Sequence, residues 1–213
     1  MIDTKRKIKV GILGCGAIGS RMALSIKDEL KSKAVVSAIF DIQDERAKKL
    51  AKNFSRAKII KRSFEDLVKS CDLMVEAINA QDTQKLIRQA LLAKKDVLVM
   101  SVGKLLGAHD IFKIAAKNRC RLLVPSGAVA GLDAVKAASQ RKIFSITLTT
   151  RKPTFGFSQN AYISQQKIDL KSITRETVLF DGKVTSAGEH FPQNINVAAA
   201  IALATLAGDK RRI

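Results

Sequence analysis

The first 125 residues alternate short apolar runs with amphipathic stretches of helical length. The apolar runs are rich in Val, Ile and Leu without polar alternation, which is typical of parallel strands covered on both faces. We expect strands at Lys7–Leu13, Ala34–Phe40, Ala57–Ile60, Leu73–Ala77, Val97–Ser101 and Arg121–Val124. Helices are expected at Ala17–Lys31, Asp44–Asn53, Ser63–Lys69, Asp82–Ala93 and His109–Asn118. Repeated βα units predict a doubly wound parallel sheet of the Rossmann type over residues 1–125.

The pattern changes after Val124, and we assign residues 126–213 to a smaller α+β domain. Alternating positions predict antiparallel strands at Phe144–Thr150 and Glu176–Phe180. The last apolar stretch, NINVAAAIALATLAG, predicts a helix that Gly208 closes. So few strands make an incomplete sheet with an exposed edge. We therefore expect that a partner chain completes the sheet, or that this chain is C-terminally truncated.

A glycine-rich turn follows the first apolar run, where Gly14, Gly16 and Gly19 form G-x-G-x-x-G. In this pattern the first glycine allows a tight turn and the second lets backbone N–H groups approach a pyrophosphate. The third lets the helix pack close to the strand. The helix begins at Ala17 and Ile18, where unpaired N–H donors and a partial positive charge suit a phosphate. The turn therefore predicts dinucleotide binding, and the alternative is a strand–helix turn without a ligand.

Asp41 ends the second apolar run, twenty-two residues after Gly19. An acid at this distance is placed to accept hydrogen bonds from the adenosine ribose hydroxyls. Its charge repels a 2′-phosphate, so NAD is expected to be preferred over NADP. The basic residues Arg46 and Lys48 follow closely and soften that repulsion, so we expect NADP to be tolerated.

The chain carries an excess of positive charge, with 38 Lys+Arg against 19 Asp+Glu, a formal net charge of +19. Basic residues are scattered over the predicted helices, and one Tyr and no Trp are available for base stacking. The charge therefore indicates a solvated basic surface that is compatible with an anionic ligand. We expect no nucleic-acid partner.

Several further classes are excluded by the sequence pattern. No run of eighteen apolar residues is present and the first ten residues are polar, so we expect no membrane span, no signal peptide and a cytoplasmic location. Cys15, Cys71 and Cys120 show no C-x-x-C spacing. They are expected to be reduced thiols, and no metal site is predicted.

Three segments together resemble the L-aspartate dehydrogenase family: GILGCGAIGS (11–20), VPSGAVAGLDAV (124–135) and FPQNINVAAAIALA (191–204). VEAIN (75–79) and SVGKL (101–105) also lie where that family carries its strand-end segments. The resemblance implies an NAD(P)-dependent enzyme that oxidises L-aspartate to iminoaspartate. That product feeds NAD biosynthesis or hydrolyses to oxaloacetate and ammonia, and the reverse reaction is a reductive amination. It also implies a second domain that supports the substrate site and a homodimer.

The resemblance also carries over particular residues. It implies that Ala128 and one asparagine of the NxN motif contact the cofactor, and we favour Asn194 over Asn196. Gly127 and Asn196 are then expected near the nicotinamide or the substrate. A dicarboxylate needs cationic partners, and loop position suggests Lys104, Arg151 and Lys152.

The catalytic histidine of the family lies in a D-P…N-x-H segment, which we expect beyond Ile213. No catalytic residue is therefore assigned. The two histidines of the chain, His109 and His190, do not match that position, and His190 is only a candidate substitute acid or base. Two alternatives remain open: a non-catalytic nucleotide-binding remnant, and another reductase of the dihydrodipicolinate reductase or homoserine dehydrogenase type.

Overall fold

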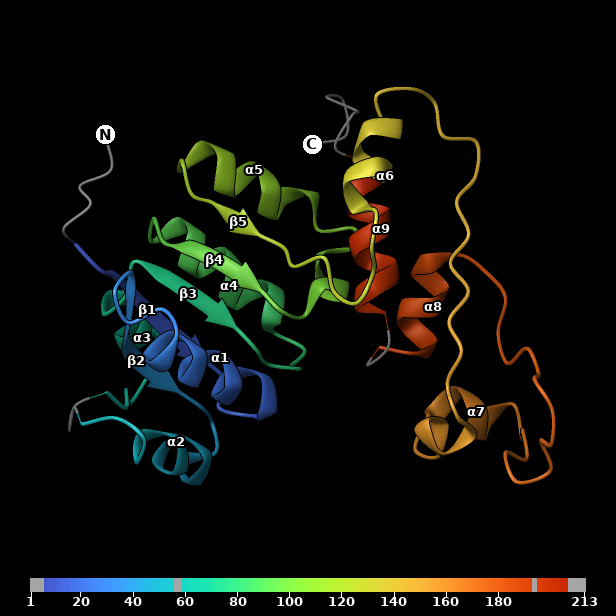
Figure 1. Cartoon of the computed structure of the whole chain (residues 1–213), viewed down its shortest axis with the longest axis horizontal. Helices are drawn as coiled ribbons and strands as arrows, with labels where there is room; N and C mark the ends of the chain where they lie inside the picture. Colours follow the sequence, from blue (N-terminus) through green and yellow to red (C-terminus); the bar gives the residue numbers. More distant parts are fainter. Residues whose placement is uncertain (1–5, 56–58, 193–194, 207–213) are drawn as a thin grey trace. The chain divides into compact units, whose positions relative to one another are not determined.

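The computed structural model divides into two compact units, Met1–Pro125 and Ser126–Ile213. It describes residues 6–55, 59–192 and 195–206. The first unit contains a parallel sheet in the order β2-β1-β3-β4-β5 (Figure 1). Its strands are β1 (Ile8–Leu13), β2 (Ala34–Phe40), β3 (Leu73–Glu76), β4 (Asp96–Val99) and β5 (Leu122–Leu123). The predicted Rossmann sheet is confirmed, with strand bounds shifted by a few residues.

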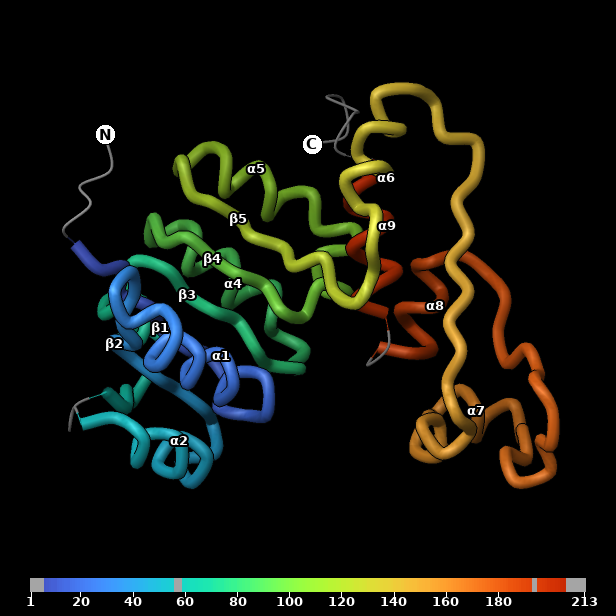
Figure 2. Tube along the Cα trace, viewed as in Figure 1, coloured from blue at the N-terminus to red at the C-terminus, as the bar shows by residue number. Residues whose placement is uncertain are grey.

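After β1 the chain forms β2 on one side of β1 and then β3, β4 and β5 on the other side. The colours from blue to green in Figure 2 follow this path. This reversal places a topological switch point between β1 and β3, at the carboxyl ends of these two strands. Of the strand predicted at Ala57–Ile60, the described residues confirm only an isolated parallel bridge between Ile60 and Ile39. Ala57 and Lys58 of that prediction lie outside the described residues.

Helices cover both faces of the sheet. They are α1 (Ala17–Asp28), α2 (Asp44–Ala51), α3 (Phe64–Lys69), α4 (Thr83–Leu92) and α5 (His109–Lys117), with the 3₁₀ turn η1 (Val102–Leu105) after β4. A Cβ on Gly11 would lie 3.3 Å from Cγ of Leu67 in α3 and 2.9 Å from Sγ of Cys71. The next residue, Ile12, packs instead against Gly19 of α1. Because successive side chains of a strand point to opposite faces, α1 and α3 lie on opposite sides of β1.

The core of the first unit lies between these layers. Fully buried apolar side chains come from strands β1 to β4 and from the helices that face the sheet. Among them are Ile12, Ile39, Met74, Val97, Leu67, Ile87 and Ile111. Strands buried on both faces need such continuous apolar runs. This is why the pattern along the sequence located them correctly.

The second unit is helical in its described residues. It contains α6 (Leu132–Ala138), the 3₁₀ turn η2 (Thr154–Phe157), α7 (Ala161–Gln165), α8 (Val184–His190) and α9 (Asn196–Leu206). Helices α6 and α8 pack against α9. The predicted closing residue, Gly208, lies outside the described residues. No helix in the described part of the chain is long and apolar enough to cross a membrane.

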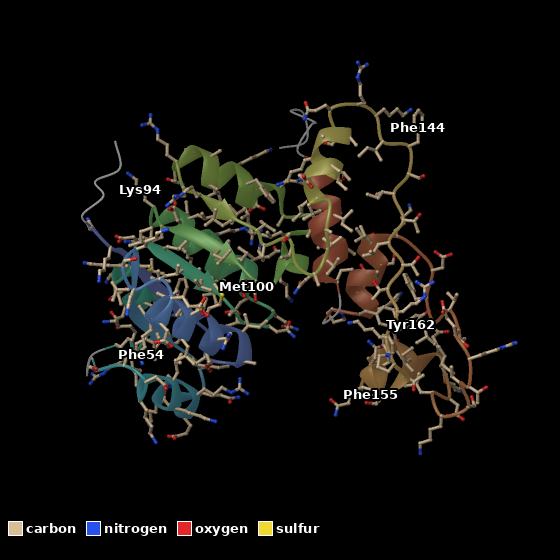
Figure 3. The ribbon with its side chains drawn as sticks, in the orientation of Figure 1. Phe54, Lys94, Met100, Phe144, Phe155 and Tyr162 are labelled. Atoms are coloured by element: carbon tan, nitrogen blue, oxygen red, sulfur yellow. The ribbon has the colours of Figure 1, made fainter. Side chains whose placement is uncertain are left out.

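The antiparallel strands predicted at Phe144–Thr150 and Glu176–Phe180 are wrong. Both segments are without regular structure, and the described residues of the second unit hold no strand. A strand needs a hydrogen-bonded neighbour, and alternation along the sequence does not supply one. The apolar positions of the first segment stay exposed, with Phe144 at 88%. Figure 3 labels Phe144. An exposed ion pair between Arg151 and Glu176, 2.9 Å apart, joins the two segments.

Candidate dinucleotide-binding site

The glycine turn after β1 is built so that two of its three glycines have no room for a side chain. Gly14 has φ +94°, and a Cβ there would lie 2.5 Å from the carbonyl oxygen of Ala77. A Cβ on Gly19 would lie 1.8 Å from the carbonyl oxygen of Gly14. Gly16 differs, because a Cβ there would meet nothing within 4 Å. The loop is therefore tight on its inner side and open at Gly16.

Helix α1 begins directly at this open side. Its N-cap residue is Gly16, which offers no side-chain cap, and the first turn contains no acidic residue. The first N–H groups of a helix have no carbonyl partner within the helix, and the helix dipole adds a partial positive charge there. A Gly16 without a side chain therefore leaves these donors accessible, and the cradle fits the pyrophosphate of a dinucleotide.

Asp41 is joined to the glycine turn by a hydrogen bond. The backbone N–H of Cys15 donates to Oδ2 of Asp41 at 2.7 Å, and the backbone N–H of Gln43 donates to Oδ1 at 2.8 Å. The carboxylate is only 9% exposed. Each carboxylate oxygen has a second lone pair, so it still has capacity for a ribose hydroxyl. The structure thus brings Asp41 and the glycine turn together, and gives Asp41 a loop-bracing contact that the sequence pattern did not reveal.

The thiols near this site are held in their protonated form. Burial, together with the charge of Asp41, raises the pKa of Cys15 to about 12. Burial also raises the pKa of Cys71 to about 11. Because the thiolate is the reactive form, both side chains act as small apolar groups at neutral pH. All three cysteines are free.

Glu76 is a functional candidate that the sequence analysis missed. It ends β3 with no exposed surface. Its Oε1 accepts from the backbone N–H of Ile78 at 2.8 Å, and its Oε2 accepts from the hydroxyl of Ser101 at 2.6 Å. Burial raises the pKa of this carboxyl, and the hydrogen bonds from Ser101 and the backbone oppose that shift. The signal in the sequence was a single acid at the end of the apolar run LMV.

Lys104, the predicted substrate contact of the first unit, lies in η1 and is partly buried. The backbone carbonyl of Lys104 accepts a hydrogen bond of 2.8 Å from Nε2 of Gln84 in α4. The same Gln84 accepts from Arg88, which is paired with Asp110 of α5. Neighbouring helices therefore hold the turn that carries Lys104.

In the second unit the predicted cofactor contacts partly converge. Gly127 has φ +69°, and a Cβ there would lie 3.4 Å from Cγ2 of Val197. The loop with Gly127 and the exposed Ala128 therefore lies against the first turn of α9, which begins at Asn196. Asn194 lies outside the described residues.

His190 ends α8 within a cluster of aromatic rings. Its ring lies 4.2 Å from that of Tyr162 and 5.4 Å from that of Phe180, measured between centroids. His190 and Tyr162 border a hollow of about 470 Å³, and Glu189 also lines it. Arg151, another predicted carboxylate partner, is already paired with Glu176. His109 is the first residue of α5. In the described ranges no group of His, Cys, Asp and Glu could hold a metal ion.

Two family models match the two units. The model described as aspartate dehydrogenase, C-terminal, matches residues 133–213. The model described as homoserine dehydrogenase, NAD binding domain, matches residues 14–125.

Relatives and solved structures agree with these matches. L-aspartate dehydrogenase of Methanosarcina barkeri is 35% identical over 97% of this chain and 77% of its own length. That of Methanococcoides burtonii is 37% identical over the same shares of both chains. Aspartate dehydrogenase from Thermotoga maritima superposes with a TM-score of 0.63 at 19% identity, over 95% of this chain and 75% of its own. The WlbA dehydrogenase from Bordetella pertussis, in complex with NADH and UDP-GlcNAcA, gives a TM-score of 0.53 at 21% identity, over 62% and 42%.

Proposed function

This chain belongs to the L-aspartate dehydrogenase family, and from that premise we propose that it is an NAD(P)-dependent oxidoreductase that interconverts L-aspartate and iminoaspartate. Hydrolysis of the imine gives oxaloacetate and ammonia. The observation that carries the cofactor half of this proposal is the glycine turn. It is open at Gly16 and hydrogen-bonded to Asp41, the residue that follows β2.

The cofactor supplies the hydride chemistry when bound, and the chain supplies its binding and orientation. The N–H groups at the start of α1 hold the pyrophosphate, and Asp41 accepts hydrogen bonds from the ribose. The negative charge of Asp41 repels a 2′-phosphate, so NAD is preferred over NADP. Ala17 and Ile18 contribute through their backbone, because the pyrophosphate is recognised by N–H groups and not by side chains.

Within the second unit, we propose that Gly127, Ala128 and an asparagine of the NxN motif contact the nicotinamide or the substrate. Gly127 and Ala128 offer a small-residue surface against which a flat ring can lie. The amide of Asn194 or Asn196 can donate and accept at once, which matches a carboxamide or orients the substrate. Of the predicted cationic partners, Arg151 is already paired with Glu176, and we propose Lys104 and Lys152 as partners of the substrate carboxylates.

The function is tested in the direction of reductive amination. Oxaloacetate, ammonium, NADH and a proton are expected to give aspartate, NAD⁺ and water. The loss of absorbance at 340 nm measures NADH oxidation, and chromatography detects the aspartate formed. Omitting ammonium is the matched control, because NADH oxidation that persists without it would indicate a ketone reductase. A chain that binds NADH but forms no aspartate would contradict the proposed activity and favour a non-catalytic nucleotide-binding protein.

We also propose that the chain functions as a homodimer. The segment 144–150, which has no regular structure, exposes Phe144, Ile146 and Leu148. Exposed apolar side chains grouped in this way are typical of a surface that binds another chain. Sedimentation equilibrium is expected to give twice the chain mass of 23.2 kDa. A concentration-independent mass of one chain would contradict the dimer.

A further inference from the structure

Glu76 is a buried carboxyl group with several hydrogen-bond donors, whereas an apolar side chain would suffice to fill the same space. It is completely buried, and a buried carboxylate costs free energy unless hydrogen bonds satisfy it. Its two oxygens receive three donors, from the backbone of Ile78, the backbone of Ser101 at 3.2 Å and the hydroxyl of Ser101. The carboxylate therefore joins two turns that follow neighbouring strands.

Both turns lie at the carboxyl edge of the sheet, where open α/β sheets bind their ligands. The turn after β3 abuts the glycine loop, since a Cβ on Gly14 would lie 2.7 Å from Cγ2 of Ile78. The turn after β4 leaves the strand at Met100, which Figure 3 labels, and continues through Ser101 into η1. Glu76 thus links the neighbour of the glycine loop to the start of η1.

The hydroxyl of Ser101 is committed to this link. Ser101 is the N-cap residue of η1, yet its side chain makes no capping hydrogen bond within the turn. The hydroxyl donates to Glu76 instead, and the carbonyl of Ser101 accepts from the backbone N–H of Lys104 at 2.9 Å. At the other end of η1, Gln84 donates to the carbonyl of Lys104. The backbone that carries Lys104 is therefore fixed at both ends by side chains.

We propose that Glu76 is a positioning residue that acts through Ser101 to hold η1, and with it Lys104, in the conformation that receives a substrate carboxylate. This inference rests on the proposed dehydrogenase function. It places the effect of the Ser101 hydroxyl on the substrate, because that hydroxyl bonds Oε2 of Glu76 from the side of η1, whereas Oε1 bonds the Ile78 turn beside the glycine loop. The effect should therefore appear in the KM for oxaloacetate.

The test compares Ser101→Ala with Ser101→Thr, which retains a hydroxyl. Ser101→Ala is expected to raise the KM for oxaloacetate about tenfold, with the dissociation constant of NADH changed by less than about threefold, because one charge-assisted hydrogen bond is lost. Ser101→Thr is expected to restore the wild-type KM. The control is Ser70→Ala, which removes a hydroxyl that donates to a backbone carbonyl at the end of α3, and it should change neither constant.

A second variant and a second measurement separate this proposal from the function itself. Glu76→Gln is expected to raise the KM as well, because its amide NH₂ would face a backbone N–H donor. If the wild type turns over and all variants keep its KM, the positioning role is overturned and the function stands. If the wild type does not turn over, amide exchange of Val102–Leu105 decides: Ser101→Ala should speed it about tenfold, and unchanged exchange overturns the proposal.

Discussion

Gly19→Ala is expected to destabilise the protein by about 3 kcal/mol, at the upper end of the range for an overpacked site. The added Cβ would lie 1.8 Å from the carbonyl oxygen of Gly14 and 3.3 Å from Cγ2 of Ile12. Neither neighbour can yield locally, because the first is backbone in a tight turn and the second is a buried side chain of β1. Either α1 or the glycine turn must move. Urea unfolding followed by circular dichroism measures the loss.

Gly16→Ala is the matched control, because it adds the same methyl group to the same loop without a clash. A Cβ there meets nothing within 4 Å, and the backbone of Gly16 is in the extended region. We expect stability within about 0.5 kcal/mol of the wild type. The affinity for NADH should nevertheless fall at least tenfold, since the methyl group fills the open side of the loop. Unchanged affinity in Gly16→Ala would contradict the pyrophosphate site, and unchanged stability in Gly19→Ala would contradict the packing.

Asp41→Ala is expected to lower both stability and cofactor affinity. It removes the acceptor of the Cys15 and Gln43 N–H groups, and orphaned buried donors cost about 1–3 kcal/mol each. It also removes the ribose contact, so the affinity for NADH should fall about 100-fold. Asp41→Asn keeps one carbonyl oxygen and loses the charge, so its loss of stability should be smaller. Urea unfolding and fluorescence titration with NADH and NADPH measure these effects.

The preference between the two cofactors gives the sharper test of Asp41. Removing its charge in Asp41→Asn should lower NADH affinity more than NADPH affinity, because only the latter gains relief from repulsion. Asp44→Asn is the control, since Asp44 is an exposed acid in the first turn of α2. It should leave the ratio of the two affinities unchanged. Equal or tighter binding of NADPH by the wild-type chain would contradict the role given to Asp41.

The Rossmann sheet and the location of the glycine turn could be predicted from the residue pattern alone. Buried parallel strands require continuous apolar runs, and the turn out of β1 requires glycine at Gly14 for its positive φ and at Gly19 for its closeness to the Gly14 carbonyl. Both signals lie within a few residues of one another along the chain. The start of the following helix also depends on residues close by in the chain, so its first residue, Ala17, was predicted correctly.

Contacts between residues far apart in the chain could not be predicted in this way, because they depend on how the elements pack. The contact of Asp41 with Cys15 spans 26 residues, and that of Glu76 with Ser101 spans 25. No local pattern encodes which buried acid meets which turn. The segment 144–150 alternates apolar and polar residues as a strand would. It forms no strand, because a strand also needs a neighbouring strand to which its backbone can hydrogen-bond. The local pattern therefore predicts the apolar strands and the turns, whereas the contacts between distant residues follow from the packing of the folded chain.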